Sequence, residues 1–219
     1  MSVRIKYPRT PHFMWSRGVA SDDQLLAYLR HWIDQPVVIT AKMDGENTTI
    51  YGDGLHARSI DSRSHPSRSW VQQWSATWRH ELPRGWRVCG ENLYARHSIH
   101  YRHLTSYFYG ISIWNDENLC LAWDDTTMYF TLLGITPVPE LWRGVWSPRT
   151  ERWLRDGALA AETHAGDPLE GYVVRLAGPI RYRDFSDSVA KYVRAHHVQT
   201  TDRWSRDQIV PNRLRQSDS

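Results

Sequence analysis

The sequence predicts an α+β domain built from antiparallel β-sheets flanked by helices. Residues 37–42 and 48–51 are short runs rich in β-branched residues, which are typical of strands. Asp-Gly pairs at Asp44-Gly45 and Asp53-Gly54 predict tight turns after these runs, and therefore an antiparallel meander. The sequence holds no Gly-x-Gly-x-x-Gly and no Gly-x-x-x-x-Gly-Lys loop. A parallel nucleotide-binding sheet is therefore not indicated.

The N-terminal part of the chain is predicted to contain one helix. Residues 1–20 hold two prolines and few periodic apolar residues, so we expect them to run extended over the surface. Ser21 is a typical N-cap, two aspartates follow it, and apolar residues recur at helical spacing from Leu25 to Trp32. These features predict a helix that begins at residue 21.

Helices and strands alternate further along the chain. Pro66 suits a first helical turn, and apolar residues recur at helical spacing after it, so a helix is predicted at 66–82. The other predicted elements are strands near 56–58 and at 86–93, 107–114, 119–123, 170–176 and 188–194, and helices near 125–133 and 148–161. The predicted organisation is an extended segment (1–20), one domain (21–195) and a polar C-terminal tail (196–219).

Composition limits the compartment and the partners. The chain has 219 residues, 41% of them hydrophobic, and a formal net charge of +3, which permits a polyanionic partner without requiring one. Cys89 and Cys120 lie in strand-like runs and form no zinc pattern, so we expect buried free thiols in a reducing compartment. No apolar stretch suits secretion or a bilayer. These observations favour a soluble, cytoplasmic protein without a membrane partner.

Lysine is rare in this chain, with three residues against 24 arginines, and two of the three stand in motif-like segments, Lys42 and Lys191. Arginine stays protonated at any working pH, whereas a lysine in a desolvated, cation-rich pocket can lose its proton and attack. Lys42, in Lys-Met-Asp-Gly, is therefore the candidate nucleophile. The alternative is that Lys42 ends a strand before a tight turn.

Several further segments follow Lys42 in a characteristic order. They are Ala-Arg-Ser around Arg58, Val-Cys-Gly-Glu-Asn-Leu-Tyr around Glu91, the aromatic strand that begins at Tyr107, Glu-Gly-Tyr-Val-Val-Arg from Glu170, and Ala-Lys-Tyr-Val-Arg around Lys191. From residue 42 to 194 this set resembles the covalent nucleotidyltransferases, which are polynucleotide ligases and mRNA capping enzymes. Within them it is most similar to small bacterial and phage ATP-dependent RNA ligases.

The resemblance implies a nucleotidyltransferase (ATP-grasp-like ligase) domain and a role for each motif. Lys42 would attack the α-phosphate of ATP and form a lysyl-AMP, and Lys191 would bind that phosphate. Glu170 would hold Mg²⁺ or Mn²⁺, and Asp44 would orient Lys42 or a metal-bound water. The remaining implied cofactor contacts are Glu91 on the ribose, Phe108 stacked on the adenine, and Arg58 and Asn47 on phosphates.

Each assignment has a structural alternative. Glu91 and Glu170 could be exposed acids at strand ends, and Phe108 could be a core residue, since alternating aromatics in a strand usually pack. In a regular strand Glu170 and Arg175 would face opposite ways, which makes Arg175 structural or RNA-facing.

The last strand departs from the family pattern. Many relatives carry a second lysine two residues after the first, but Val193 stands there, and Arg194 points away in a regular strand. Either the strand ends or bulges, or Lys191 acts alone.

Only 25 residues follow Arg194, too few for the C-terminal OB barrel of many ligases and capping enzymes. RNA with 5'-phosphate and 3'-hydroxyl ends or nicks is the expected partner, contacted by the domain surface, by residues 1–36 or through a protein partner. A GTP-dependent capping guanylyltransferase, a DNA ligase and an inactive RNA-binding relative remain alternatives.

Overall fold

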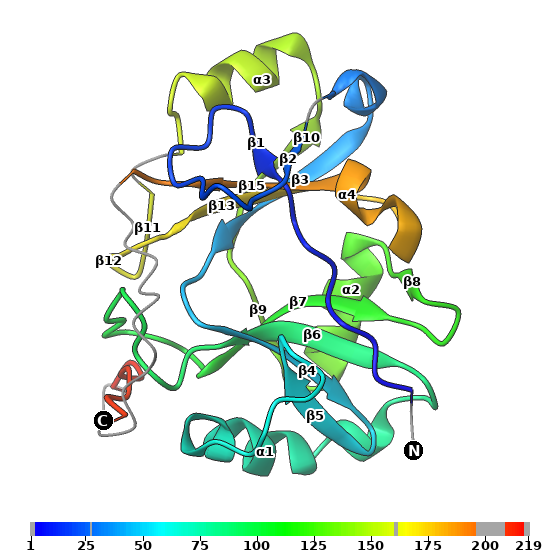
Figure 1. Cartoon of the computed structure of the whole chain (residues 1–219), viewed down its shortest axis with the longest axis vertical. Helices are drawn as coiled ribbons and strands as arrows, with labels where there is room; N and C mark the ends of the chain where they lie inside the picture. The colour runs from blue at the N-terminus through cyan, green and yellow to red at the C-terminus, as the bar shows by residue number, and fades with distance from the viewer. Residues whose placement is uncertain (1–2, 27, 160–161, 196–208, 217–219) are drawn as a thin grey trace.

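The computed structural model of the chain describes residues 3–26, 28–159, 162–195 and 209–216. Two large β-sheets lie one above the other, with α3 (Pro148–Arg155) above the first sheet and α1 (Ser69–Ala76) below the second (Figure 1). This arrangement confirms the predicted α+β class.

The first sheet has six strands and carries an aromatic core on its outer face. Their order is β10 (Glu140–Val145), β3 (Pro36–Lys42), β13 (Gly171–Leu176), β15 (Val189–Val193), β1 (His12–Phe13) and β2 (Leu25–Leu26). Pairing is antiparallel from β10 to β15 and parallel from β15 to β2. Phe13, Trp32, Trp146 and Tyr172 pack together on the outer face with Leu154 of α3.

The second sheet has seven strands and is covered by α1 and α2 (Trp123–Leu132). Its order is β14 (Ile180–Arg181), β8 (Leu119–Cys120), β7 (Phe108–Trp114), β6 (Arg87–Asn92), β4 (Glu46–Tyr51) and β5 (Gly54–Ala57), with β9 (Thr136–Pro137) parallel to β7. The outer core includes Ile50 of β4, Val71 of α1 and Phe130 of α2. The smaller elements are the hairpin β11 (Thr163–His164) and β12 (Asp167–Pro168), α4 (Phe185–Ser188), and 3₁₀ turns at Arg30–Trp32, Pro66–Arg68, Arg79–Glu81 and Tyr182–Asp184.

The turn at Asp44-Gly45 does not close a hairpin, so the meander prediction was wrong there. β3 pairs with β10 and β13, whereas β4 pairs with β5 and β6. The chain therefore crosses from the first sheet to the second directly after Lys42. The hairpin at Asp53-Gly54 is confirmed, and Gly54 adopts a φ of 148° there.

The helix predicted from residue 21 was also wrong. Leu25–Leu26 form a strand instead, and the backbone N–H of His12 donates to the carbonyl oxygen of Gln24 at 2.7 Å. The Asp23 carboxylate accepts from the backbone of Ala20, so its polar contacts fold the chain into a turn rather than a helix. Strand β10 was not predicted, because none of its residues is fully buried and its sequence shows no clean alternation. The predicted helices at 66–82 and 148–161 are confirmed as shorter segments, and the helix predicted at 125–133 is confirmed as α2, which begins two residues earlier.

Both ends of the described chain pack on the domain. Arg4 pairs with Asp53 of the second sheet at 2.9 Å, and His12 then lies in register with Lys191 of the first, so residues 4–12 run from one sheet to the other (dark blue in Figure 1). In the C-terminal segment, Asn212 is buried and its amide donates to the carbonyl oxygen of Leu93 at 2.7 Å. The rest of the predicted tail, 196–208 and 217–219, lies outside the described residues. No helix in the described ranges is long and apolar enough to cross a membrane.

Candidate active site

The end of β3 brings Lys42 and Glu170 together. β3 pairs with β13 so that Lys42 lies opposite Gly171, and the backbone N–H of Glu170 donates to the carbonyl oxygen of Lys42 at 3.2 Å. The Nζ of Lys42 donates to the Oε2 of Glu170. Glu170 precedes the strand, so strand alternation does not apply to it. Its carboxylate is nearly buried, which rules out the exposed-acid alternative.

Carboxylates, rather than cations, dominate the surroundings of Lys42. Burial favours the neutral amine, but the negative charges of Glu170 and Glu91 outweigh burial and raise the pKa of Lys42 above its ordinary value. The expectation of a cation-rich pocket is therefore corrected. In this state Lys42 is an ammonium ion, and it must lose a proton before it can act as a nucleophile.

Lys42 opens into a cavity between the facing sides of the two sheets. Five of the residues singled out in the sequence line it: Lys42, Asn47, Arg58, Glu91 and Lys191. They come from β3, β4, the end of β5, β6 and β15, so strands far apart in sequence converge on one space. The other lining residues are Tyr7, Pro8, Thr10, Thr40, Ala41, Met43, Ile111, Val138 and Val173.

Two polar groups in this cavity are suited to a ligand. The Oδ1 of Asn47 is buried and has no hydrogen-bond partner among the described residues. An acceptor of this kind is costly unless a donor such as a hydroxyl or amino group meets it. The second group is the carboxyl of Glu91. Burial and the charge of Glu170 raise its pKa to about 8, against the opposing charge of Lys42.

Asp44 organises the loop beside Lys42. Its Oδ2 accepts hydrogen bonds from Ser98 Oγ at 2.7 Å and from the backbone N–H of Ile99 at 2.8 Å. Its own N–H donates to the hydroxyl of Tyr101 at 2.9 Å. Asp44 also adds negative charge near Lys42, although less than Glu170 and Glu91 add.

Phe108 is not placed to stack on a base in this cavity. Its ring is fully buried in the outer core of the second sheet, 5.3 Å from the ring of Trp74 and close against Gly90. The assignment to adenine is therefore corrected to the core alternative. The β7 residue that lines the cavity is Ile111.

Arg175 has a structural role, which is one of the two roles that the sequence left open for it. Its guanidinium is buried, donates to the carbonyl oxygen of Leu121 at 3.0 Å and lies over the ring of Trp123.

Sequence reasoning missed the contribution of the N-terminal segment. Tyr7, Pro8 and Thr10 line the cavity, and the ring of Tyr7 packs against Phe185 at 5.4 Å. An extended segment without periodicity gives no local signal of what it covers. The two closely spaced prolines indicated only that this segment is extended, and not which surface it covers.

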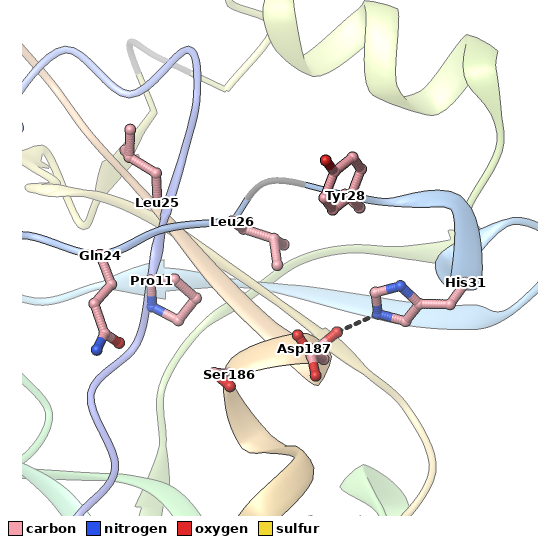
Figure 2. A pocket seen from close by; sticks show the side chains of 8 residues that line it. All are labelled: Pro11, Gln24, Leu25, Leu26, Tyr28, His31, Ser186 and Asp187. Carbon is pink, nitrogen blue, oxygen red and sulfur yellow. Dashed lines mark hydrogen bonds between the residues drawn. The ribbon is translucent and has the colours of Figure 1, made fainter.

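A second, wider hollow lies at the free edge of the first sheet (Figure 2). It is lined by Pro11, Gln24, Leu25, Leu26, Tyr28, His31, Ser186 and Asp187. His31 Nε2 lies 2.5 Å from the carbonyl oxygen of Asp187 and is therefore engaged in holding the fold. The hollow contains none of the candidate site residues, so the cavity at Lys42 is the candidate active site.

This fold and this cavity define a domain of the nucleotidyltransferase type. A family model described as RNA ligase matches residues 35–193. The chain therefore belongs to the RNA ligase family.

Solved structures share the fold at low sequence identity. A Naegleria gruberi RNA ligase variant with ATP and Mn superposes with a TM-score of 0.55 at 17% identity, over 76% of this chain and 52% of that one. An archaeal ATP-dependent RNA ligase gives 0.55 at 15% identity, over 86% and 48%. The chain thus spans about half the length of these relatives. No curated protein sequence matches it.

Proposed function

We propose that the protein is an ATP-dependent RNA ligase that works through a covalent lysyl-AMP. The observation that carries this proposal is the convergence of Lys42, Asn47, Glu91 and Lys191 on one cavity, with Glu170 bonded to Lys42 at its edge. A binding module has no need of an amine buried among carboxylates, whereas covalent nucleotidyl transfer needs a nucleophile, a phosphate-binding cation and ribose contacts.

The proposed reaction has three transfers. The neutral amine of Lys42 attacks the α-phosphorus of ATP, so that a nitrogen–phosphorus bond forms and pyrophosphate leaves. An oxygen of an RNA 5'-phosphate then attacks the same phosphorus and releases Lys42, which leaves AMP on the RNA end. A 3'-hydroxyl finally attacks the 5'-phosphate, the phosphodiester forms and AMP departs.

The chain's residues have distinct parts in these steps. Glu170 accepts the hydrogen bond of Lys42 and is the nearest base for its proton. Lys191 balances the negative charge that grows on the α-phosphate. Glu91 and Asn47 face each other across β4 and β6 and bind the ribose and polar groups of the nucleotide. Arg58, exposed at the cavity, contacts phosphates of ATP or RNA.

A divalent cation fits this site only together with ATP. Among the described residues, no three His, Cys, Asp or Glu side chains are grouped to hold a metal. Magnesium in ATP sites is typically bound by one or two carboxylates, phosphate oxygens and waters. Glu170 would hold such an ion, Mg²⁺ or Mn²⁺, and the ion would supply positive charge against the phosphates.

The proposed partner is RNA, and the proposed setting is the cytoplasm. The two cysteines are free and buried, which suits a reducing compartment. The positive net charge suits a polyanionic substrate.

Covalent labelling tests this proposal. The protein is incubated with α-labelled ATP or GTP and then denatured. We expect label from ATP to remain on the wild type, and no label on Lys42→Arg, which keeps the charge but cannot supply a neutral amine. Label retained by Lys42→Arg would reject the nucleophile, and label from GTP alone would favour capping chemistry. Sealing of single-stranded, RNA-templated and DNA-templated ends then identifies the substrate.

A further inference from the structure

Lys191 is held from the side by the N-terminal segment. Its backbone N–H donates to the carbonyl oxygen of Pro11 at 2.9 Å, and His12 lies opposite it in the parallel pairing of β1 with β15. Its Nζ lies 3.8 Å from Asp23 Oδ1, and both side chains are mostly buried. Asp23 is thus the acidic neighbour of the amine that reaches the cavity.

Asp23 also lies against a fully buried histidine, His12. Its Oδ2 lies 3.1 Å from His12 Nε2 and accepts from the backbone N–H of Ala20 at 2.9 Å. The other ring nitrogen of His12, Nδ1, lies 2.8 Å from Ser16 Oγ. Ser16 Oγ also accepts from the backbone N–H of Val193 at 3.0 Å. His12 Nε2 is within ion-pair distance of Asp23, but it makes no aligned hydrogen bond among the described residues.

The contacts form a chain that begins and ends on β15, from Val193 through Ser16, His12 and Asp23 to Lys191. Serine, histidine and aspartate in this order also occur in hydrolases, but here Ser16 is buried and its oxygen is bonded to the backbone. The arrangement is therefore suited to fixing a position and not to attacking a substrate.

The same segment explains the missing second lysine. Val193 is buried, and a Cβ added to Gly18 would lie only 2.6 Å from its Cγ1, so the N-terminal segment covers the position where many relatives carry a lysine. β15 ends at Val193, and Lys191 alone serves that face. Burial and the charge of Lys42 lower the pKa of Lys191, whereas Asp23 opposes this change. A single amine in this setting needs an acidic partner to stay charged and in place.

We infer that Asp23, which lies between His12 and Lys191, is a positioning residue that holds the amine of Lys191 in place toward the α-phosphate of ATP. This inference rests on the proposed function, because it assigns the purpose of Lys191 within it. It gives the N-terminal segment a part in adenylylation as well as in closing the cavity.

A double-mutant cycle tests the inference. Single-turnover formation of the Lys42 adduct is measured for the wild type, Asp23→Asn, Lys191→Met and the double variant. We expect Asp23→Asn to slow the reaction about tenfold and to have no further effect once Lys191 is replaced. Asp23→Glu, which keeps the charge, should recover most of the rate. If the double variant loses the product of the two single-variant losses of rate, the inference is overturned. Such a result would mean that Asp23 and Lys191 act independently, as they would if Asp23 had only a structural role.

Asp22→Asn is the matched control. Asp22 is the preceding aspartate, but its carboxylate pairs at the surface with Arg9 at 2.8 Å. We expect this variant to react at the wild-type rate. Thermal unfolding of each variant identifies any that fails to fold.

A second readout does not depend on ligase activity. Acetylation of Lys191 by an amine-reactive reagent is followed by mass spectrometry at mildly alkaline pH without ATP. We expect Asp23→Asn to speed this acetylation several-fold, because more of the amine is neutral, and Asp22→Asn to leave it unchanged. Unchanged acetylation in Asp23→Asn would overturn the inference. A wild type that forms no adduct, with Lys191 still responding to Asp23→Asn, would instead reject the proposed function and retain the contact.

Discussion

At the residue scale, neighbouring side chains of one strand differ in role, because some pack in the core and others line the cavity. Phe108 and Ile111 both belong to β7, but Phe108 is buried in the outer core and Ile111 lines the cavity. Phe108→Ala should lower the free energy of unfolding by about 3–5 kcal/mol, because it opens a cavity in the core. ATP affinity of the folded variant should change little.

Ile111→Ala is the matched comparison. This substitution removes an apolar side chain from the wall of the cavity. It should weaken ATP binding by about tenfold and have a smaller effect on stability than Phe108→Ala. Denaturant unfolding and calorimetric ATP titration measure both properties. A Phe108→Ala protein that is as stable as the wild type but no longer binds ATP would contradict the core assignment and support stacking of Phe108 on adenine.

Glu91 illustrates a cost of the site to stability. Burial, with the charge of Glu170, raises its pKa to about 8, well above the value in an unfolded chain. A group with a raised folded pKa favours folding while it is protonated in both states, and this contribution is lost as pH rises from about 4.5 to about 8. Glu91→Gln should therefore be about 1–2 kcal/mol more stable than the wild type above that range, and no more stable below it.

The same substitution should weaken adduct formation, since it removes a proposed ribose contact. Unfolding by denaturant at several pH values, together with α-labelled ATP, measures the two effects. A stability difference that does not grow with pH would contradict the burial of this carboxylate.

The candidate residues from the sequence that line the cavity share a property. Lys42, Glu91 and Lys191 stand on strands or at strand ends within short motifs, where sequence pattern and chemistry coincide. The adenine role of Phe108 was implied by the resemblance alone, whereas the alternating aromatics of the strand indicated the core position that is observed. Tyr7 and Asp23 were missed because their positions depend on contacts with β15 and α4, far along the chain.

At the element scale, local signals identified strands better than their partners. β3, β4, β6, β7, β13 and β15 were predicted close to their observed bounds, because their β-branched and aromatic residues are buried on both faces. The pairing of β3 with β13 joins residues about 130 positions apart, which no turn motif can indicate. The predicted helix at residue 21 failed because tertiary pairing with β1 outweighed local propensity.

Gly171 is the point at which three of these strands meet. It lies opposite Lys42 on one side and Val193 on the other, and an added Cβ would overlap the carbonyl oxygen of Tyr192. Gly171→Ala should therefore force β13 and β15 apart and displace both Glu170 and Lys191. We expect a loss of stability of at least about 2–3 kcal/mol and loss of the adduct.

Gly178→Ala is the control, since no atom lies within 4 Å of an added Cβ there. Circular dichroism, thermal unfolding and adduct labelling compare the two variants. Normal labelling by Gly171→Ala would show that the strands can adjust without moving the site.

At the scale of the whole molecule, the cavity depends on two sheets between which the chain passes several times, and some of these crossings carry residues that line the cavity. The crossing after Lys42 links β3 to β4, and residues 4–12 link the second sheet back to β1. Glu91 and Asn47 are on one sheet, and Lys42 and Lys191 are on the other. The relative placement of the sheets therefore sets the distance between these two groups of cavity residues, so we expect the N-terminal crossing to affect both folding and the proposed adenylylation.

Protonation of His12 at acidic pH should destabilise this N-terminal crossing. Burial, with the charge of Lys191, lowers the pKa of His12 to about 4, although Asp23 opposes the shift and Lys42 adds to it. A group with a depressed folded pKa contributes stability that is present above its unfolded pKa of about 6.5 and is lost as pH falls toward 4. The free energy of unfolding should fall by up to about 3 kcal/mol over that interval from this residue.

Carboxylates titrate at the lower end of this pH interval, so the comparison with His12→Gln isolates the contribution of the histidine. The variant should be less stable than the wild type near neutral pH, and the difference should shrink as the solution is acidified. A difference that is constant with pH would mean that His12 accepts a proton in the folded protein as readily as in the unfolded chain.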